Sequence, residues 1–219
     1  MSDHRSVAAG PTGRTPTSPA AEKKRPHHHS LVELLVIVVV ALGLALLIQA
    51  FLVKPYRIPS ESMEPTLDVG QRVLVSRFNY KFSDPDRGDI VVFHPPAGAA
   101  SNSCGVQHPE DQACASPTRA RDDVNFIKRI VATPGDSLSI RDGHAVVNGV
   151  RQKEDFIRPC APGTCDFPRQ IKIPKGYFFM MGDNRGASDD SRFWGPVPKK
   201  WIIGQAFATY WPPKRVGIL

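Results

Sequence analysis

The sequence predicts a mostly β, antiparallel domain preceded by one N-terminal transmembrane helix. Proline and glycine are abundant, with 21 and 17 among 219 residues, which favours many turns and short strands over long helices. A long apolar run lies near the N-terminus, and short β-branched or aromatic runs recur between turn residues after it. A chain of this length holds one modest globular domain and an anchor, but not two large domains.

Residues 1–30 are predicted to form a disordered cytoplasmic tail. They are rich in Ser, Thr, Pro, Ala, Lys, Arg and His, contain no Phe, Trp or Tyr and show no apolar periodicity, so they lack the side chains that build a core. His27, His28 and His29 raise the alternative of a metal site. The sequence offers no second cluster to complete a coordination shell, so a solvated tail is favoured.

The apolar run from Leu31 to Val53 predicts the transmembrane helix. Glu33 and Gln49, one near each end, interrupt the run. At about 1.5 Å per residue the helix is roughly 34 Å long, which exceeds a hydrocarbon core of about 30 Å. A cleavable signal sequence is the alternative, but the run is too long and no small-x-small site follows it. We therefore expect a retained, single-pass anchor.

Basic residues set the expected orientation of this anchor. Lys23, Lys24 and Arg25 precede it, so the amino end is expected in the cytoplasm and the rest of the chain outside. Lys54 and Arg57 weaken this asymmetry without reversing it.

The formal charge of +7 raises the possibility of nucleic-acid binding. The basic residues are scattered and form no long cationic run. Attraction to anionic lipid headgroups explains the charge equally well. We expect the lipid bilayer as a partner, and no nucleic acid.

Runs of β-branched and aromatic residues after the anchor are typical of antiparallel strands. In SLSIRDGHAVVNG, Asp142-Gly143 joins two short strands and Asn148-Gly149 closes the second, which is a hairpin signal. The other predicted strands lie at residues 72–75, 89–93, 126–131, 177–181 and 201–210.

Four cysteines form two local pairs, Cys104 with Cys114 and Cys160 with Cys165. Neither spacing is the C-x-x-C of a zinc ribbon or a thioredoxin-type site. Two disulfides in an oxidising compartment are the natural interpretation, with sequence-neighbour pairing favoured among three connectivities, and free buried thiols are the alternative. Each pair falls in a segment without strand-like runs, so these segments are predicted to be disulfide-pinned excursions. The two segments are residues 94–124 and 150–172.

Familiar metal, triad and phosphate motifs are absent from the sequence. The chain contains no H-E-x-x-H, no G-x-S-x-G, no S-x-x-K and no Walker-type glycine loop. We therefore expect neither a metal nor a cofactor.

Two serines stand out in the segment PSESMEPTL at residues 59–67, a few residues beyond the anchor. Pro59 and Pro65 bracket them, and proline fixes φ and so rigidifies the loop that displays the hydroxyls. A Ser/Pro-rich juxtamembrane linker has the same composition, so this segment alone does not decide between a site and a linker.

Lys128 lies in the run FIKRIV. Strand alternation puts Phe126, Lys128 and Ile130 on one face, so the lysine shares that face with apolar neighbours. A desolvated lysine has a lowered pKa, and its neutral amine can act as a general base. The alternative is an edge-strand lysine whose stem covers apolar surface while its amine reaches water.

The segment GDNRGASDDSRFWGPV at residues 182–197 is dense in Gly, Asp, Asn and Ser and follows an apolar strand. Its composition predicts a loop. Such a loop can also supply an ordered polar shell around a site, with Asp190 and Arg192 able to pair. Composition does not choose between these interpretations.

The segments PSESMEPTL, GDIVVF, IKRIVATPGD and GDNRGASDDSRFWGPV have the order and character of the signature boxes of bacterial type I signal peptidases. The sequence thus resembles this family of serine/lysine-dyad membrane proteases, and the preceding single anchor agrees. The resemblance implies an endopeptidase of the bacterial cytoplasmic membrane. It implies removal of N-terminal signal peptides from secreted preproteins, with cleavage after small residues at Ala-x-Ala-type sites.

The resemblance also implies roles for particular residues. Ser62 is the nucleophile, and Lys128 is the base that removes its proton and later protonates the leaving amine. The hydroxyl of Ser60 helps the Ser62 N–H to form an oxyanion hole, and Ser188 orients the lysine amine. The remaining expectations are a structural pair between Asp190 and Arg192, Met63 lining the pocket behind the nucleophile, and Asp183 and Asn184 shaping the last box.

The fold that the resemblance implies is a mostly β catalytic core with a smaller β region inserted between the lysine strand and the last box. Residues 54–219 are then the extracytoplasmic catalytic domain. Residues 136–181 are left for the inserted region, so it is expected to be reduced to the Asp142-Gly143 hairpin and the Cys160–Cys165 loop.

Two other classes of protein fit part of the sequence. A self-cleaving repressor is similar in its dyad and β core, but it carries a DNA-binding helical domain where this chain has residues 31–53. A catalytically dead, membrane-tethered binding protein is expected to lose a dyad residue, whereas Ser62 and Lys128 are both present.

Overall fold

The computed structural model describes residues 31–219. The predicted cytoplasmic tail, with its histidines, lies outside the described residues. The chain divides into two compact units between Ala41 and Leu42, and all of the strands belong to the second unit.

Helix α1 comprises Leu31–Phe51, which the apolar run predicted. The helix ends two residues earlier than expected because Val53 begins a strand, β1 (Val53–Arg57). That strand pairs with β2 (Arg72–Ser76), where Val53 lies opposite Ser76. Within the part of the chain that the structure describes, no helix has both the length and the apolar character needed to cross a membrane.

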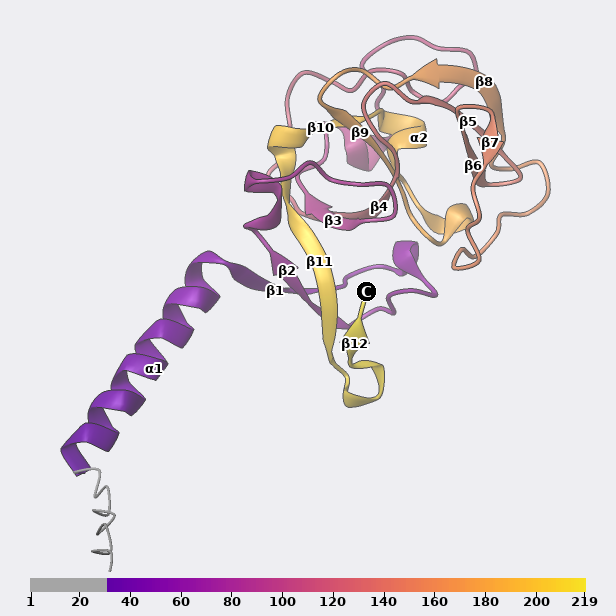
Figure 1. Ribbon diagram of the computed structural model, residues 1–219. Coiled ribbons are helices and arrows are strands. Elements are labelled where there is room, and N and C mark those ends of the chain that lie inside the picture. The colour runs from indigo at the N-terminus through magenta and orange to yellow at the C-terminus, as the bar shows by residue number, and fades with distance from the viewer. Residues whose placement is uncertain (1–30) are drawn as a thin grey trace, which may run out of the picture. The chain divides into compact units, whose positions relative to one another are not determined.

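The larger sheet is eight-stranded and antiparallel, with the order β1-β2-β11-β3-β4-β9-β10 and β12 added beside β11. Figure 1 shows β11 as its longest ribbon, beside β2 and β3. The mostly antiparallel β prediction is confirmed, and the predicted strands of this sheet are present within a residue or two. The bounds are Ile90–Phe93 for β3, Phe126–Ala132 for β4, Tyr177–Met181 for β9, Val197–Pro198 for β10, Ile202–Trp211 for β11 and Gly217–Ile218 for β12.

A four-stranded sheet has the order β7-β6-β5-β8. The predicted hairpin joins β5 (Ser137–Arg141) to β6 (His144–Val147). Asp142 and Gly143 have φ values of 49° and 73°, as a two-residue hairpin turn requires. Strand β7 is Val150–Arg151 and β8 is Phe167–Lys172.

Strand β8 lies inside a segment that was predicted to contain no strand. Its sequence FPRQIK is largely exposed and β8 ends the order of its sheet, so it is an edge strand with little apolar signal. Strand β9 falls within residues 136–181, yet it pairs with β4 in the larger sheet. The inserted region therefore contributes β5 to β8 to one sheet and β9 to the other.

Short helices connect the strands. The four-residue helix α2 (Ser191–Trp194) begins after Asp190, whose side chain accepts a hydrogen bond from the Arg192 N–H. The 3-10 helices are η1 (Glu61–Met63), η2 (Asn79–Lys81), η3 (Ala99–Ser101), η4 (Arg185–Ala187), η5 (Lys199–Trp201) and η6 (Pro213–Arg215).

Both predicted disulfides are present, Cys104–Cys114 and Cys160–Cys165. The Cys114 N–H donates to the Arg192 carbonyl oxygen at 2.9 Å, which ties the excursion at 94–124 to the last signature segment. The second disulfide lies beside Gly143, because a Cβ added there would be 3.4 Å from Cys160 Sγ. It also lies beside Arg185, whose carbonyl oxygen is 3.5 Å from Cys165 Sγ.

Candidate active site

Ser62 and Lys128 meet in the structure although 66 residues separate them. The distance from Lys128 Nζ to Ser62 Oγ is 2.6 Å. Ser62 is in η1 and Lys128 is near the centre of β4. Both residues are buried, with 6% and 5% of their surface exposed, so the contact forms largely out of water.

The loop that carries Ser62 is held by buried apolar side chains and by hydrogen bonds from the last signature segment. Met63 and Leu67 are fully buried in one apolar cluster, and the Leu67 N–H donates to the Met63 carbonyl oxygen at 2.9 Å. From the last signature segment, the Asn184 N–H donates to the Ser62 carbonyl oxygen at 3.1 Å, and its amide Nδ2 donates to the Glu61 carbonyl oxygen at 3.2 Å. These bonds fix the serine relative to that segment.

The surroundings of Lys128 lower its pKa to about 8 from the ordinary 10.5. Burial is the main cause, because it disfavours the ammonium form. The carboxylates of Asp190 and Asp189 act in the opposite direction, and Arg192 adds to the lowering. The Phe126 ring centroid is 5.9 Å from Nζ, as expected for residues that share one face of a strand.

Asp190 and Arg192 form a buried ion pair, with 2.7 Å between Arg192 Nε and Asp190 Oδ1. Asp190 also accepts from the Gly182 N–H at 3.0 Å. Burial alone raises the pKa of Asp190, but the charge and hydrogen bonds of Arg192, together with the Gly182 N–H, hold it below its ordinary value. The carboxylate is therefore ionised beside the dyad.

Ser188 contacts Asp190 rather than the lysine. Its Oγ donates to Asp190 Oδ2 at 2.8 Å, and within the described residues no hydrogen bond joins Ser188 to Lys128. A buried carboxylate is the stronger acceptor, since charge-assisted hydrogen bonds exceed neutral ones. The orienting role implied for Ser188 stays a prediction.

Asp183 is buried and forms a second ion pair, with Arg129, which the sequence analysis did not predict. Arg129 donates to both of its oxygens, at 2.9 and 2.7 Å, and Thr66 Oγ1 donates at 2.5 Å. These contacts join β4, the loop after Ser62 and the last signature segment. Alternation along β4 puts Arg129 on the face opposite Lys128, together with Ile127 and Val131, and a charge among buried apolar residues implies a partner. The sequence therefore contained a signal for the ion pair of Arg129.

A cavity of about 400 Å³ opens beside the dyad. Ser60 lines it, and Ser60 Oγ is 3.3 Å from Ser62 Oγ. Met63 is not among its lining residues. Sequence reasoning did not assign several other residues to this wall, because which residues of a segment face a cavity depends on the tertiary fold. The lining residues are Pro59, Ser60, Glu61, Ser62, Asn125, Phe126, Ile127, Lys128, Ala187 and Asp189.

A neighbouring cavity of about 310 Å³ shares part of this wall. Pro59, Asn125, Phe126 and Ile127 line both cavities. Three of these four shared residues, Pro59, Phe126 and Ile127, are apolar, so the two cavities adjoin a common and largely apolar wall.

Comparison with known protein families gives a match over most of the chain. The family profile "Signal peptidase, peptidase S26" matches residues 31–211. The chain is 35% identical over 198 residues to "Probable signal peptidase I-2" of Synechocystis sp., covering 90% of this chain and 81% of that protein. It is 35% identical over 214 residues to "Signal peptidase I" of Leptolyngbya laminosa, covering 98% and 96% of the two chains.

A plant relative extends the comparison. The chain is 40% identical over 176 residues to "Thylakoidal processing peptidase 1, chloroplastic" of Arabidopsis thaliana, covering 80% of this chain and 47% of that protein. The profile match and the bacterial relatives together span most of the chain. The chain therefore belongs to the signal peptidase I family, the serine peptidases S26.

Proposed function

We propose that this signal peptidase I, a serine endopeptidase that removes signal peptides, works through a Ser62/Lys128 dyad. The proposal rests on one observation, the 2.6 Å separation between Lys128 Nζ and Ser62 Oγ. A neutral amine at this distance accepts the hydroxyl proton as Oγ attacks the scissile carbonyl. With its pKa near 8, the amine is neutral in a large fraction of molecules at mildly alkaline pH.

The same amine serves in each later step. After attack, the ammonium of Lys128 gives its proton to the leaving amine, and an ester between the substrate acyl group and Ser62 Oγ remains. Lys128 then takes a proton from a water molecule, which attacks the ester. The second tetrahedral intermediate collapses as the proton returns to Ser62 Oγ, so the enzyme ends in its starting state.

Ser60 is proposed to help stabilise the oxyanion of these intermediates, together with the Ser62 N–H. Its hydroxyl lies 3.3 Å from Ser62 Oγ and lines the same cavity, which supports this placement. A donor of this kind contributes roughly 10²- to 10³-fold in rate.

Four further residues complete the proposed site. Asp190 and Arg192 hold its shape through their buried pair. Ser188 is proposed to orient the amine, because its hydroxyl binds the carboxylate of Asp190, whose charge acts more strongly on Lys128 than any other. Met63 is proposed to back the pocket, since it adjoins the nucleophile and is fully buried.

The proposed substrates are N-terminal signal peptides that end in Ala-x-Ala. The preference for small residues near the cut is the one that the family resemblance implies, and a subsite that fits an alanine side chain would reject larger ones sterically.

A membrane location is also part of the proposal, with residues 1–30 cytoplasmic, residues 31–53 as a single-pass anchor and the catalytic domain outside. Support comes from the apolar sequence of α1 and from the basic residues that precede it. One relative is named as thylakoidal, which is also a membrane location.

Cleavage of a preprotein by the full chain in detergent tests the dyad. Ser62→Ala is expected to abolish processing while circular dichroism stays unchanged, whereas Ser101→Ala, which changes an exposed serine outside the cavity, keeps full activity. A second preprotein with phenylalanine in place of the last alanine should resist cleavage. Substantial turnover by Ser62→Ala would contradict the mechanism.

A further inference from the structure

A cavity of about 400 Å³ outside the active site has a strongly cationic wall. Of the described residues that line it, none is acidic. We call it the cationic pocket. Its charged or titratable residues are Arg77, Lys81, His94, Arg121, Lys199 and Lys200.

Part of this charge has no counterion. Lys199 Nζ is 2.6 Å from Asp84, and Arg121 is 3.8 Å from Asp123. Both carboxylates are largely exposed, 79% and 95%, so water screens these two pairs. For the other cations, Arg77, Lys81 and Lys200, the described part of the chain offers no carboxylate within 4 Å.

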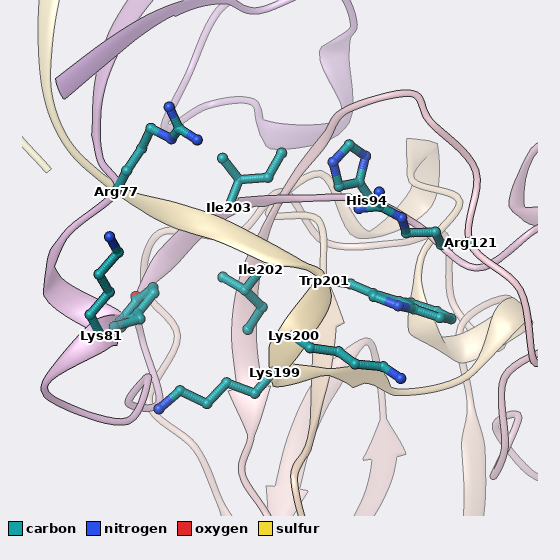
Figure 2. Close-up of a pocket in the computed structure, with 10 residues that line it drawn as sticks. Arg77, Lys81, His94, Arg121, Lys199, Lys200, Trp201, Ile202 and Ile203 are labelled. Atoms are coloured by element: carbon teal, nitrogen blue, oxygen red, sulfur yellow. The ribbon is translucent and has the colours of Figure 1, made fainter. Parts of the chain in front are cut away.

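The cations are spread over the pocket rather than gathered at one point. Figure 2 shows Arg77 and Lys81 at one end and His94 and Arg121 at the other, with Ile202 and Ile203 between them. The side chains of Lys199 and Lys200 extend in different directions. One bound phosphate cannot contact all of these groups, whereas a surface that presents several phosphates can.

Exposed aromatic side chains flank this pocket. Phe78 and Phe82 are 44% and 77% exposed, and their ring centroids are 4.7 Å apart. They bracket η2, which contributes Tyr80 and Lys81 to the pocket. Aromatic residues beside basic ones are typical of protein surfaces at the headgroup level of a bilayer.

We infer that the cationic pocket binds the phosphate groups of anionic phospholipids. The cations attract the headgroups, and Phe78 and Phe82 are placed to enter the interface beside them. This site is distinct from the active site, because the two cavities have no residue in common. The inference rests on the proposed membrane location.

Native mass spectrometry of the full chain in a neutral detergent tests the inference. Phosphatidylglycerol, phosphatidylcholine and inorganic phosphate are added separately, and bound adducts are counted. The test variant is Arg77→Gln/Lys81→Gln/Lys200→Gln. The matched control is Arg141→Gln/Lys172→Gln/Lys175→Gln, which removes the same charge from exposed positions outside the pocket.

The wild type is expected to prefer phosphatidylglycerol over phosphatidylcholine. At about fivefold per cation, the test variant should lose roughly a hundredfold in affinity for phosphatidylglycerol, while the control keeps most of it. Equal losses in both variants, or no preference between the two lipids, would overturn the inference. Phosphate binding with the same affinity and the same loss would overturn it in favour of a free oxyanion site.

Failure of this inference is separable from failure of the proposed function. The readout is lipid binding without turnover, so it does not depend on the dyad. An incorrect membrane location would appear separately, as release of the chain from membranes by alkaline carbonate.

Discussion

The amine of Lys128 lies in a buried position that disfavours its charged form. Its burial lowers the pKa to about 8. Among the described residues no carboxylate contacts the ammonium form directly, since the amine's hydrogen bond goes to Ser62 Oγ. The residue is thus suited to gain and lose a proton near neutral pH.

The rate of cleavage is expected to follow this deprotonation. Turnover should rise with pH and level off above an apparent pKa near 8, because the ammonium form cannot accept the Ser62 proton. Lys128→Arg should be inactive across the whole range, since guanidinium stays protonated. Initial rates on a preprotein from pH 6 to 11 would measure both. A wild-type rate that still climbs beyond pH 10 would contradict the assignment.

The same burial predicts that Lys128 destabilises the fold. The unfolded chain binds the lysine proton up to its ordinary pKa of 10.5, whereas the folded chain releases it near 8, so below pH 8 folding is opposed by on the order of 3 kcal/mol. Lys128→Met should therefore raise the midpoint of thermal unfolding at pH 7 by roughly 5 to 10 °C.

Measuring the wild type and Lys128→Met at several pH values provides the control for this stability prediction. As pH rises from 8 to 10.5, the unfolded chain also loses the lysine proton, and the destabilisation by Lys128 disappears. The difference in unfolding midpoint between the wild type and Lys128→Met should therefore shrink over that window. A difference that stays constant from pH 7 to 10 would assign the effect to packing and not to charge.

The sequence predicted the residues that the proposed mechanism requires, and their catalytic roles stay predictions. It did not predict all of the residues that line the cavity. Ser62, Lys128 and the Asp190–Arg192 pair lie in segments of distinctive composition. Asn125 and Ala187 also line the cavity. Ala187 lies in the same segment as Asp190, but which residues of a segment face a cavity depends on the tertiary fold, which local pattern does not encode.

The last signature segment packs closely on the loop that carries Ser62. A Cβ added at Gly182 would overlap Ser188 Oγ and the Ser62 carbonyl oxygen, so the absence of a side chain lets these segments touch. The glycine also donates its N–H to Asp190. One small residue therefore sets the spacing between η1 and this segment.

Gly182→Ala is expected to displace Ser62 and to lower kcat by about a hundredfold, as small misplacements of a nucleophile do. Gly186→Ala is the matched control, because its added Cβ would lie 3.7 Å from Cys160 Cα, an ordinary contact, and should change kcat by less than about twofold. Steady-state kinetics on one preprotein compares them. Similar losses in both variants would contradict this role.

The strands show where sequence patterns are informative. Strand β4 and the hairpin of β5 and β6 have dense apolar residues or turn residues, and they were predicted. Strands β1 and β10 contain Pro55 and Pro198, and both end the order of the larger sheet. Proline is tolerated at sheet edges, but in a sequence it argues against a strand, so these two were missed.

Across the whole molecule, one buried ion pair connects the two sheets. Arg185, in the segment that follows β9, donates to Glu154, which follows β7, at 3.1 and 2.7 Å. The side chains are 0% and 5% exposed. Glu154 also accepts from the Ala145 N–H in β6 at 3.0 Å, and Arg192 donates to the Arg185 carbonyl oxygen at 2.8 Å. The smaller sheet is thereby joined to the site.

Glu154→Gln is expected to lower the free energy of unfolding by roughly 3 kcal/mol or more, because it leaves the guanidinium of Arg185 buried without a counterion. The adjacent Asp155→Asn is the matched control. Its partner Lys153 and Asp155 itself are 86% and 76% exposed, so the loss should be below about 1 kcal/mol. Denaturant unfolding of both variants provides the test, and equal effects would contradict it.

The proposed catalytic residues come from three stretches far apart in the chain, η1, β4 and the segment before α2. Synthesis proceeds from the amino end, so Ser62 is made first, and the lysine that is proposed to activate it follows 66 residues later. On this mechanism, activity begins only once all three stretches have been made and have folded together. The chain's own apolar amino-terminal helix is made before any peptidase exists in that molecule to cut it.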